Sequence, residues 1–367
     1  MNHPPDLGDL HHHGQSPWMD NLRREWLTNG ELARWVERGI RGLTSNPSIF
    51  QKAISSGHDY DEQFGNLIRQ GSSVLDAYWD LVTTDINGAL ALLRPVYDAS
   101  DGVDGYVSVE IAPDLARDAA GTQRAARRLH ERINEPNLYV KIPGTSEGIA
   151  PIQTMIAEGR SINVTLIFSL ERYAEVMEAY LAGLERAEGD LSRISSVASF
   201  FISRVDSEVD RRLDAIATPA ALALRGRVAI AQAQVAYAEF RATFQGERWE
   251  TLVARGARVQ RPLWASTSTK NPTYPDTCYV DELIGPDTVN TMPEETIAAF
   301  LDHGRVERRV DAHPDAAREV LAAAEAVGVH LADVGEVLEA QGVASFAKAF
   351  DDLIGVLQAK AVETTTP

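Results

Sequence analysis

The sequence has little cysteine, no excess of basic residues and no long apolar run, and each of these absences argues against a class of protein. Cys278 is the only cysteine among 367 residues, so an intrachain disulfide is excluded and a reducing, cytoplasmic compartment is expected. Acidic residues outnumber basic ones, 53 to 35, and the net charge of -18 argues against a nucleic-acid or membrane-surface partner. No apolar run is long enough to span a bilayer, and we expect no signal peptide.

Cofactor motifs are scarce as well. No Gly-rich phosphate turn follows a strand-like segment, which argues against a nucleotide site. The run His11–His13 has no spaced His, Cys or carboxylate set beside it, so a solvated loop is a better interpretation than a metal site. We therefore expect neither a metal nor a cofactor.

What the sequence does contain is a repeated alternation of strand-like and helical segments. Apolar residues make up 44% of the chain, enough for a large core. Eight apolar runs are predicted as strands: 15–20, 40–46, 106–112, 137–143, 161–168, 196–203, 261–268 and 287–292. Helical spacing fills 21–39, 72–97, 122–133, 147–158, 170–187 and 206–255. This alternation predicts an α/β fold of the (β/α)8 TIM-barrel type with additional helices, and an open doubly wound sheet is the alternative.

The chain is predicted to form one domain. Helical patterns over 311–360 are expected to pack on the barrel, separated by turns at Gly328, Gly335 and Gly342. The predicted division is a flexible N-terminal segment over 1–14, a barrel with its helices over 15–360 and a tail over 361–367.

Lys141 is the most informative residue. It shares one face of its strand-like run with Tyr139, opposite Leu138, Val140 and Ile142. Burial disfavours a charged ammonium, and a neutral lysine amine is a nucleophile toward carbonyl carbon. A lysine that reaches solvent from the strand end is the alternative, and for an isolated lysine it would be preferred.

Polar side chains on the other strand-like segments favour the catalytic interpretation. The carboxyl ends of parallel barrel strands meet at one face, so these side chains are expected to converge. Each also has a structural explanation: Asp20 could cap a helix, Glu110 could form a salt bridge with Lys141, and Arg204 could pair with Asp206. The residues concerned are Asp20, Thr44, Asn46, Glu110, Asn163, Thr165, Ser199, Phe201, Arg204 and Ser266.

Several motifs together resemble the signatures of transaldolases. They are SPWMDNL (16–22), GLTSNPSIF (42–50), YVKIPGT (139–145), NVTLIF (163–168), SFFISR (199–204), WASTSTKNP (264–272) and DTVNTMP (287–293). The resemblance runs from about residue 15 to past residue 300, and the chain length and the WASTSTKNP form are similar to the longer bacterial transaldolases of the actinobacterial type.

The resemblance implies roles for individual residues. Lys141 would form the Schiff base, Asp20 would be the general acid/base, and Glu110 with Thr165 would act through one bound water. The residues implied to bind substrate are Thr44, Asn46, Asn163, Ser199, Phe201, Arg204 and Ser266.

The chain departs from its relatives at one position. Many members carry a second phosphate-binding arginine near the end of the seventh strand, where this chain has Ser268. Lys270 is the candidate substitute.

The implied activity belongs to the pentose phosphate pathway. A dihydroxyacetone unit would pass from sedoheptulose 7-phosphate or fructose 6-phosphate to glyceraldehyde 3-phosphate or erythrose 4-phosphate. The imine supplies the electron sink, so we expect activity to survive chelation by EDTA.

Two other function classes stay open. A fructose 6-phosphate aldolase would release dihydroxyacetone to water, and such relatives typically carry Gln at the position of Glu110. A non-enzymatic barrel scaffold would have lost the chemistry, which intact Lys141 and Asp20 argue against. The sequence leaves monomer and homodimer equally possible.

Overall fold

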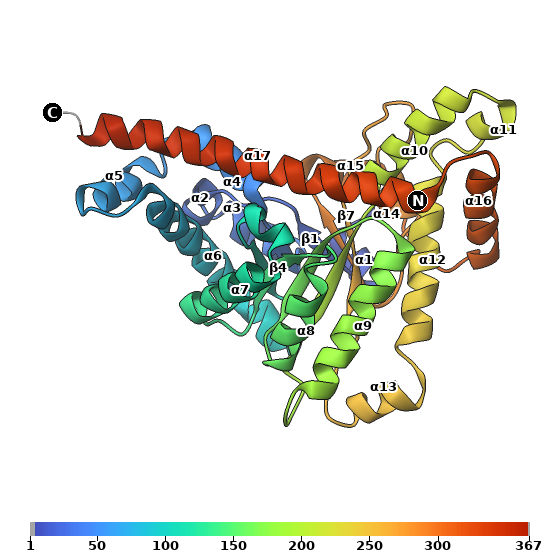
Figure 1. The fold of residues 1–367 in the computed structure, drawn as a ribbon, viewed down its shortest axis with the longest axis horizontal. Coiled ribbons are helices and arrows are strands. Elements are labelled where there is room, and N and C mark those ends of the chain that lie inside the picture. The colour runs from blue at the N-terminus through green and yellow to red at the C-terminus, as the bar shows by residue number, and fades with distance from the viewer. Residues whose placement is uncertain (1–3, 366–367) are drawn as a thin grey trace.

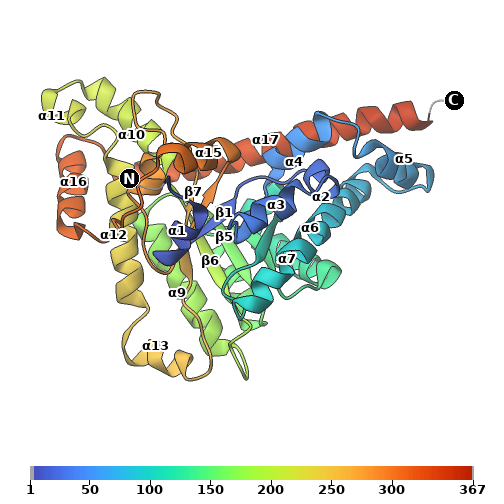
Figure 2. The same cartoon turned by 180° about the vertical axis from the view of Figure 1, so that it is seen from behind.

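The computed structural model describes residues 4–365 and contains the predicted barrel. Eight parallel strands close in the order β1-β2-β3-β4-β5-β6-β7-β8, with helices around them (Figures 1 and 2). The strands are β1 (Gln15–Met19), β2 (Gly42–Thr44), β3 (Tyr106–Glu110), β4 (Leu138–Pro143), β5 (Ile162–Ile167), β6 (Ser196–Phe201), β7 (Arg261–Ala265) and β8 (Thr288–Met292). Each predicted strand is confirmed, and the open doubly wound sheet is excluded.

The helices follow the predicted pattern with two refinements. The stretch 21–39 forms two helices, because Gly30 breaks it with a left-handed φ of 76°. The stretch 206–255 contains four helices, α10 to α13, consistent with the prediction of more than one.

The helix bounds are α1 (Leu7–His12), α2 (Arg24–Thr28), α3 (Glu31–Glu37), α4 (Pro47–Ser55), α5 (Asp61–Arg69), α6 (Val74–Ala99), η1 (Pro113–Arg117), α7 (Ala119–Ile133), α8 (Ile149–Ala157), α9 (Leu170–Arg186), α10 (Ser203–Ile216), α11 (Pro219–Leu222), α12 (Val228–Thr243), α13 (Gly246–Val253), α14 (Cys278–Asp281), α15 (Glu294–His303), α16 (Pro314–Ala326) and α17 (Leu331–Thr365). Within residues 4–365, no helix is both long and apolar enough to cross a membrane.

Strand register decides which polar side chains become neighbours. Glu110 of β3 lies opposite Lys141 of β4, and Lys141 lies opposite Asn163 of β5. One layer below, Tyr106 and Tyr139 stack with ring centroids 4.1 Å apart. These rings fill the barrel interior, so the polar layer above them is accessible only from the carboxyl end of the strands.

The long helix α17 corrects the predicted turns. The break at Gly328 is confirmed, but the helix continues through Gly335 and Gly342, where turns were predicted. A Cβ at Gly335 would lie 2.8 Å from Ser169 Cβ, and one at Gly342 would lie 2.9 Å from Leu166 Cδ2. The two glycines therefore allow close packing across the end of β5, which local sequence cannot reveal.

The course of α17 matters for the barrel mouth. In Figure 1 it runs along the upper end of the molecule, and it packs against α4, α5, α6 and α10. The helix thus connects the first and second halves of the barrel.

The N-terminal segment also differs from its prediction. Residues 7–12 form α1, which packs on β1 with Leu7 and Leu10 buried. A solvated loop was expected at His11–His13, and this was wrong for His11 and His12, which belong to the helix.

The C-terminal tail predicted from residue 361 continues as helix to Thr365. Residues 1–3 and 366–367 lie outside the described residues. The division into segment, barrel and tail stays a prediction.

Candidate active site

The carboxyl ends of the strands open into a cavity of about 300 Å³. All predicted site residues line it except Glu110 and Asn163, which lie in the polar layer beside Lys141. The lining residues from the prediction are Asp20, Thr44, Asn46, Lys141, Thr165, Ser199, Phe201, Arg204, Ser266 and Lys270. Residues from six of the eight strands and the segments that follow them therefore converge, as the barrel geometry requires.

Lys141 is buried and incompletely paired. Only 5% of the residue is exposed, and its Nζ donates a hydrogen bond to the Ser45 carbonyl oxygen at 3.1 Å. The nearest carboxylate oxygen, Glu110 Oε2, is 3.6 Å away. Burial raises the pKa of Glu110 to about 7 against the opposing effect of the lysine. The carboxyl group can therefore hold or release a proton near neutral pH.

Two buried oxygen atoms on the strands beside Lys141 make no hydrogen bond within the protein. Glu110 Oε2 and Thr165 Oγ1 both lack a hydrogen bond. Folded proteins rarely leave buried polar atoms unpaired, because each lost bond costs about 1–3 kcal/mol. These two atoms are consequently suited to bind a water molecule or a substrate hydroxyl.

Asp20 follows β1 directly at the mouth of the cavity. Its Oδ1 accepts a hydrogen bond from Thr44 Oγ1 at 2.7 Å, and Thr44 Oγ1 lies 2.7 Å from Thr291 Oγ1. Burial raises the pKa of Asp20, whereas Lys141 and Thr44 oppose the rise. The interpretation of Asp20 as a helix cap is wrong, because α2 begins later and its N-cap is Arg23.

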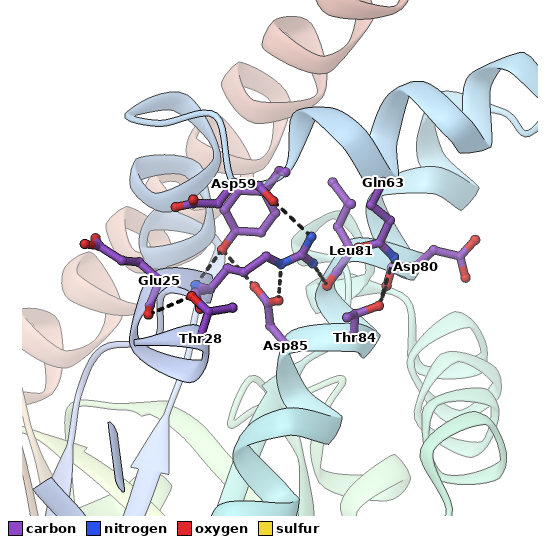
Figure 3. A network of polar contacts seen from close by, with 10 residues as sticks. Glu25, Thr28, Asp59, Gln63, Asp80, Leu81, Thr84 and Asp85 are labelled. Atoms are coloured by element: carbon purple, nitrogen blue, oxygen red, sulfur yellow. Dashed lines mark hydrogen bonds and ion pairs between the residues drawn. The ribbon is translucent and has the colours of Figure 1, made fainter. Parts of the chain in front are cut away.

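A buried ion pair fixes the segment that follows Asp20. Arg24 Nε donates to Asp85 Oδ1 at 2.7 Å, and Tyr60 donates its hydroxyl to Asp85 Oδ2 at 2.8 Å (Figure 3). Arg24 also donates to the Leu81 carbonyl oxygen at 3.2 Å. The start of α2 is thereby anchored to α6, which limits how far Asp20 can move.

A chain of hydrogen bonds orients the amide on β5. Ser199 donates its hydroxyl to Asn163 Oδ1 at 2.7 Å, and Asn163 Nδ2 donates to Ser108 Oγ at 3.0 Å. All three side chains are buried. Asn46 is oriented differently, since its Oδ1 caps α4 by accepting from Ile49 N at 3.0 Å. Its NH2 group is left to donate to another acceptor.

Arg204 is a half-buried cation near the start of α10. Its guanidinium lies 5.1 Å from the ring centroid of Phe201 and 5.8 Å from that of Phe346, and burial lowers its pKa. No carboxylate within residues 4–365 forms an ion pair with it. The pairing with Asp206 was wrong, because Asp206 accepts from Tyr279 Oη and Ala229 N, each at 2.8 Å. Arg204 can therefore bind an external anion.

The loop after β7 supplies the remaining polar groups. Ser266 has a left-handed φ of 56°, and its Oγ lies 2.8 Å from Ser203 Oγ. Lys270 is exposed, and its Nζ donates to Ser268 Oγ at 2.6 Å. A left-handed backbone at a non-glycine residue, as at Ser266, is uncommon and occurs often at functional sites.

Sequence reasoning missed several residues of the site, and four of them contact predicted site residues directly. Ser108 shares the inward face of β3 with Glu110, so the strand alternation contained a signal for it. Phe346 comes from a helix distant in sequence and had no signal. The four are Ser45, Ser108, Thr291 and Phe346.

No other reactive centre competes with this cavity in the described part of the chain. No cluster of three or more His, Cys, Asp or Glu side chains among residues 4–365 could hold a metal ion. Cys278 is half-buried, and burial raises its thiol pKa to about 11, so the unreactive thiol form dominates near neutral pH.

Comparison with known proteins gives a consistent result. The family model described as Transaldolase/Fructose-6-phosphate aldolase matches residues 17–357. A transaldolase of Thermobifida fusca is 51% identical over 353 residues, covering 95% of this chain and 96% of its own. A transaldolase of Frankia alni is 49% identical over 362 residues, 97% of each chain. A transaldolase of Mycobacterium leprae is 47% identical over 356 residues, 95% of each chain.

Proposed function

The chain belongs to the transaldolase/fructose-6-phosphate aldolase family, and we propose that it works as a transaldolase through a Schiff base on Lys141. The reaction moves a dihydroxyacetone unit from sedoheptulose 7-phosphate or fructose 6-phosphate to glyceraldehyde 3-phosphate or erythrose 4-phosphate. We assign it to the pentose phosphate pathway in the cytoplasm. The observation that carries the proposal is the buried, incompletely paired amine of Lys141 at the base of the cavity.

The first step forms the imine. The neutral Lys141 amine attacks C2 of the ketose phosphate, and the carbinolamine then loses water. Glu110, with its pKa raised to about 7, can protonate the departing hydroxyl. The unpaired oxygens of Glu110 and Thr165 offer hydrogen bonds to the water that transfers this proton. The product is a protonated imine, which draws electrons from C3.

The second step breaks the carbon–carbon bond. Asp20 accepts the proton of the C4 hydroxyl, the C3–C4 bond breaks, and its electrons move into the imine to give an enamine on Lys141. Burial raises the pKa of Asp20, which makes its carboxylate a better base. Thr44 keeps that carboxylate oriented through the 2.7 Å hydrogen bond. The aldose phosphate leaves, and a second aldose phosphate reverses the sequence.

The remaining groups hold the substrate. Asn46, Asn163 and Ser199 would bind the hydroxyls of the three-carbon unit and keep the enamine in place until the acceptor arrives. Asn46 and Ser199 line the cavity, and Asn163 is hydrogen-bonded to Ser199 behind it. Arg204 would bind the phosphate by charge-assisted hydrogen bonds, because Asp20 and Glu110 act on its charge only from a distance and no carboxylate among residues 4–365 forms an ion pair with it. Lys270 is the candidate for a second phosphate contact, with Ser266 and Ser268 beside it.

The requirement for an acceptor tests the proposed function. Purified protein would be mixed with fructose 6-phosphate, with and without erythrose 4-phosphate, in the presence of EDTA. We expect sustained formation of sedoheptulose 7-phosphate and glyceraldehyde 3-phosphate only with the acceptor. Continuous release of dihydroxyacetone without acceptor would instead identify a fructose 6-phosphate aldolase. Loss of activity in EDTA, restored by zinc or magnesium, would contradict the metal-free mechanism.

A further inference from the structure

Phe346 is the one aromatic side chain of α17 that lines the active-site cavity. The ring lies 5.8 Å from the Arg204 guanidinium, and the ring of Phe201 lies 5.1 Å from it. Phe201 belongs to the barrel and packs against Phe168 with ring centroids 4.9 Å apart. Arg204 is therefore held between the barrel wall and a helix that begins more than a hundred residues later.

Close packing of α17 is what brings Phe346 to this position. Gly342 lies one turn before Phe346 and faces Leu166, with 2.9 Å between a built Cβ and Leu166 Cδ2. Leu166 itself has a left-handed φ of 60°, within the irregular pairing of β5 with β6. A Cβ at residue 342 would press on the end of the Leu166 side chain, so either that side chain or α17 would have to shift, and the glycine permits the close approach of the helix.

Ion pairs fix α17 near both of its ends. Asp333 accepts from Arg212 of α10 at 2.5 Å, and Lys360 donates to Asp61 of α5 at 2.5 Å. These contacts attach the helix to α10 and α5, which lie toward its opposite ends in Figure 1. Phe346 is therefore presented by a helix that is anchored on either side of it.

The rings of Phe201 and Phe346 can hold the Arg204 guanidinium in place and leave its N–H groups free to bind an anion. An aromatic face attracts a guanidinium but does not accept hydrogen bonds from its N–H groups as a carboxylate does. The donors lie in the guanidinium plane and stay available for phosphate. A carboxylate at the position of either ring would compete with the phosphate for the same donors.

We propose that α17 forms one wall of the substrate-phosphate site and that Phe346 is a positioning residue for Arg204. This inference rests on the proposed function, because it takes the anion to be the phosphate of the sugar. Phe346 does not touch the reacting carbons, so its effect falls on binding of phosphorylated sugars and not on the chemical steps.

Kinetics on the full-length chain test the inference. Phe346→Leu retains most of the apolar volume and removes the aromatic face. We expect KM for fructose 6-phosphate to rise about two- to tenfold, with kcat changed less than about twofold. Activity on fructose, which lacks the phosphate, should fall much less than activity on fructose 6-phosphate. The inhibition constant of inorganic phosphate should rise in parallel with KM.

Three further variants separate positioning from packing. Phe346→Tyr keeps the aromatic face and should restore a KM near that of the wild type. Gly342→Ala adds a methyl group against Leu166 Cδ2 and should give a smaller loss in the same phosphate-specific direction. Phe350→Leu is the matched control, because Phe350 packs edge-on against Tyr78 at 5.3 Å one turn further along α17. It should leave the ratio between fructose 6-phosphate and fructose unchanged.

The outcomes distinguish this inference from the proposed function. An unchanged KM and inhibition constant in Phe346→Leu would overturn the inference, as would equal losses on both sugars. Neither result would affect imine formation in the wild type. If the wild-type protein did not transfer a dihydroxyacetone unit at all, the proposed function would fail first.

Discussion

Buried cations lie at both ends of the barrel, and they differ in how completely they are paired. At the amino end, Arg261 donates to Ser16 Oγ at 2.8 Å, to the Val103 carbonyl oxygen at 2.7 Å and to Asp104 Oδ1 at 3.2 Å. Ser16 donates to the same Asp104 oxygen at 2.7 Å. At the carboxyl end, Lys141 lies 3.6 Å from Glu110, whose Oε2 has no hydrogen bond.

This difference separates a structural ion pair from a reactive one. The group of Ser16, Asp104 and Arg261, called here the floor network, satisfies its charges with several short hydrogen bonds and is suited to hold strands together. The mouth leaves the Lys141 amine and the Glu110 carboxyl group 3.6 Å apart without a hydrogen bond, and the raised pKa of Glu110 allows its carboxyl group to exchange a proton near neutral pH. Burial alone does not distinguish the two ends, whereas the completeness of pairing does.

The largest effect is expected at the mouth. Lys141→Met should reduce turnover by more than about 10³-fold, because the nucleophile is removed. Stability should change little, since Glu110 has a raised pKa and can become neutral when the lysine is absent. Steady-state kinetics and thermal melting of the same preparation measure both quantities. A strongly destabilised variant would mean that the Lys141–Glu110 pair is structural.

The floor network should respond in the opposite way. Arg261→Met leaves the buried Asp104 carboxylate without its cation, so the free energy of unfolding should fall by about 3–5 kcal/mol. Imine formation by the protein that remains folded should be retained. Urea unfolding and borohydride trapping below the melting temperature give the two values. Normal stability with lost trapping would reverse the comparison.

Glu110→Gln tests whether the mouth carboxyl acts as an acid. We expect kcat to fall by about 10²- to 10⁴-fold, because the amide cannot protonate the departing hydroxyl. The wild-type pH profile should show a limb near pH 7 that the variant lacks, since the Glu110 pKa is raised to about 7. A limb that persists in the variant would assign that titration to another group.

Glu110→Gln should also change how the stability of the fold depends on pH. Folding raises the pKa of Glu110 from 4.5 to about 7, so between these values the folded protein binds more protons than the unfolded chain. The stabilisation from protonated Glu110 is complete below about pH 4.5 and is lost as the pH rises through 7. Melting temperatures from pH 5 to 8 should therefore decline more in the wild type than in Glu110→Gln. Parallel curves would contradict the raised pKa.

The smallest effects are expected at the phosphate site. Arg204→Ala should weaken binding of phosphorylated sugars by about 1.5–3 kcal/mol, the value of a lost charge-assisted hydrogen bond. Lys270→Ala should cost less, about 0–1 kcal/mol, because Lys270 is exposed. Kinetics with fructose 6-phosphate beside fructose measure both. Equal losses on the two sugars would mean that these residues support the fold.

Most of the fold could be predicted because its signal is local. Each strand is a short apolar run with one polar face, and the polar side chains, Lys141, Glu110 and Asn163 among them, were expected to converge once a parallel barrel was assumed. The glycines of α17 were misinterpreted, because Gly342 faces Leu166 across a tertiary contact and not a turn. Phe346 was missed for the same reason, since nothing near it in sequence indicates Arg204. Long-range packing, not propensity, decided these cases.

The pairing of Arg204 shows a second limit of sequence reasoning. Asp206 is two residues away and seemed a suitable partner, but Tyr279 and the backbone of Ala229 take both of its oxygens. The structural alternative for Arg204, which rested on proximity in sequence, is therefore excluded.

Borohydride trapping with peptide mapping tests the central claim, that the incompletely paired amine of Lys141 is the reactive one. The protein would be incubated with labelled fructose 6-phosphate, reduced, digested and analysed by mass spectrometry. Lys52 and Lys270 also line the cavity and serve as internal comparisons. The account predicts a single modified peptide containing Lys141, absent from Lys141→Met. Label on Lys52 or Lys270, or trapping that survives in Lys141→Met, would contradict it.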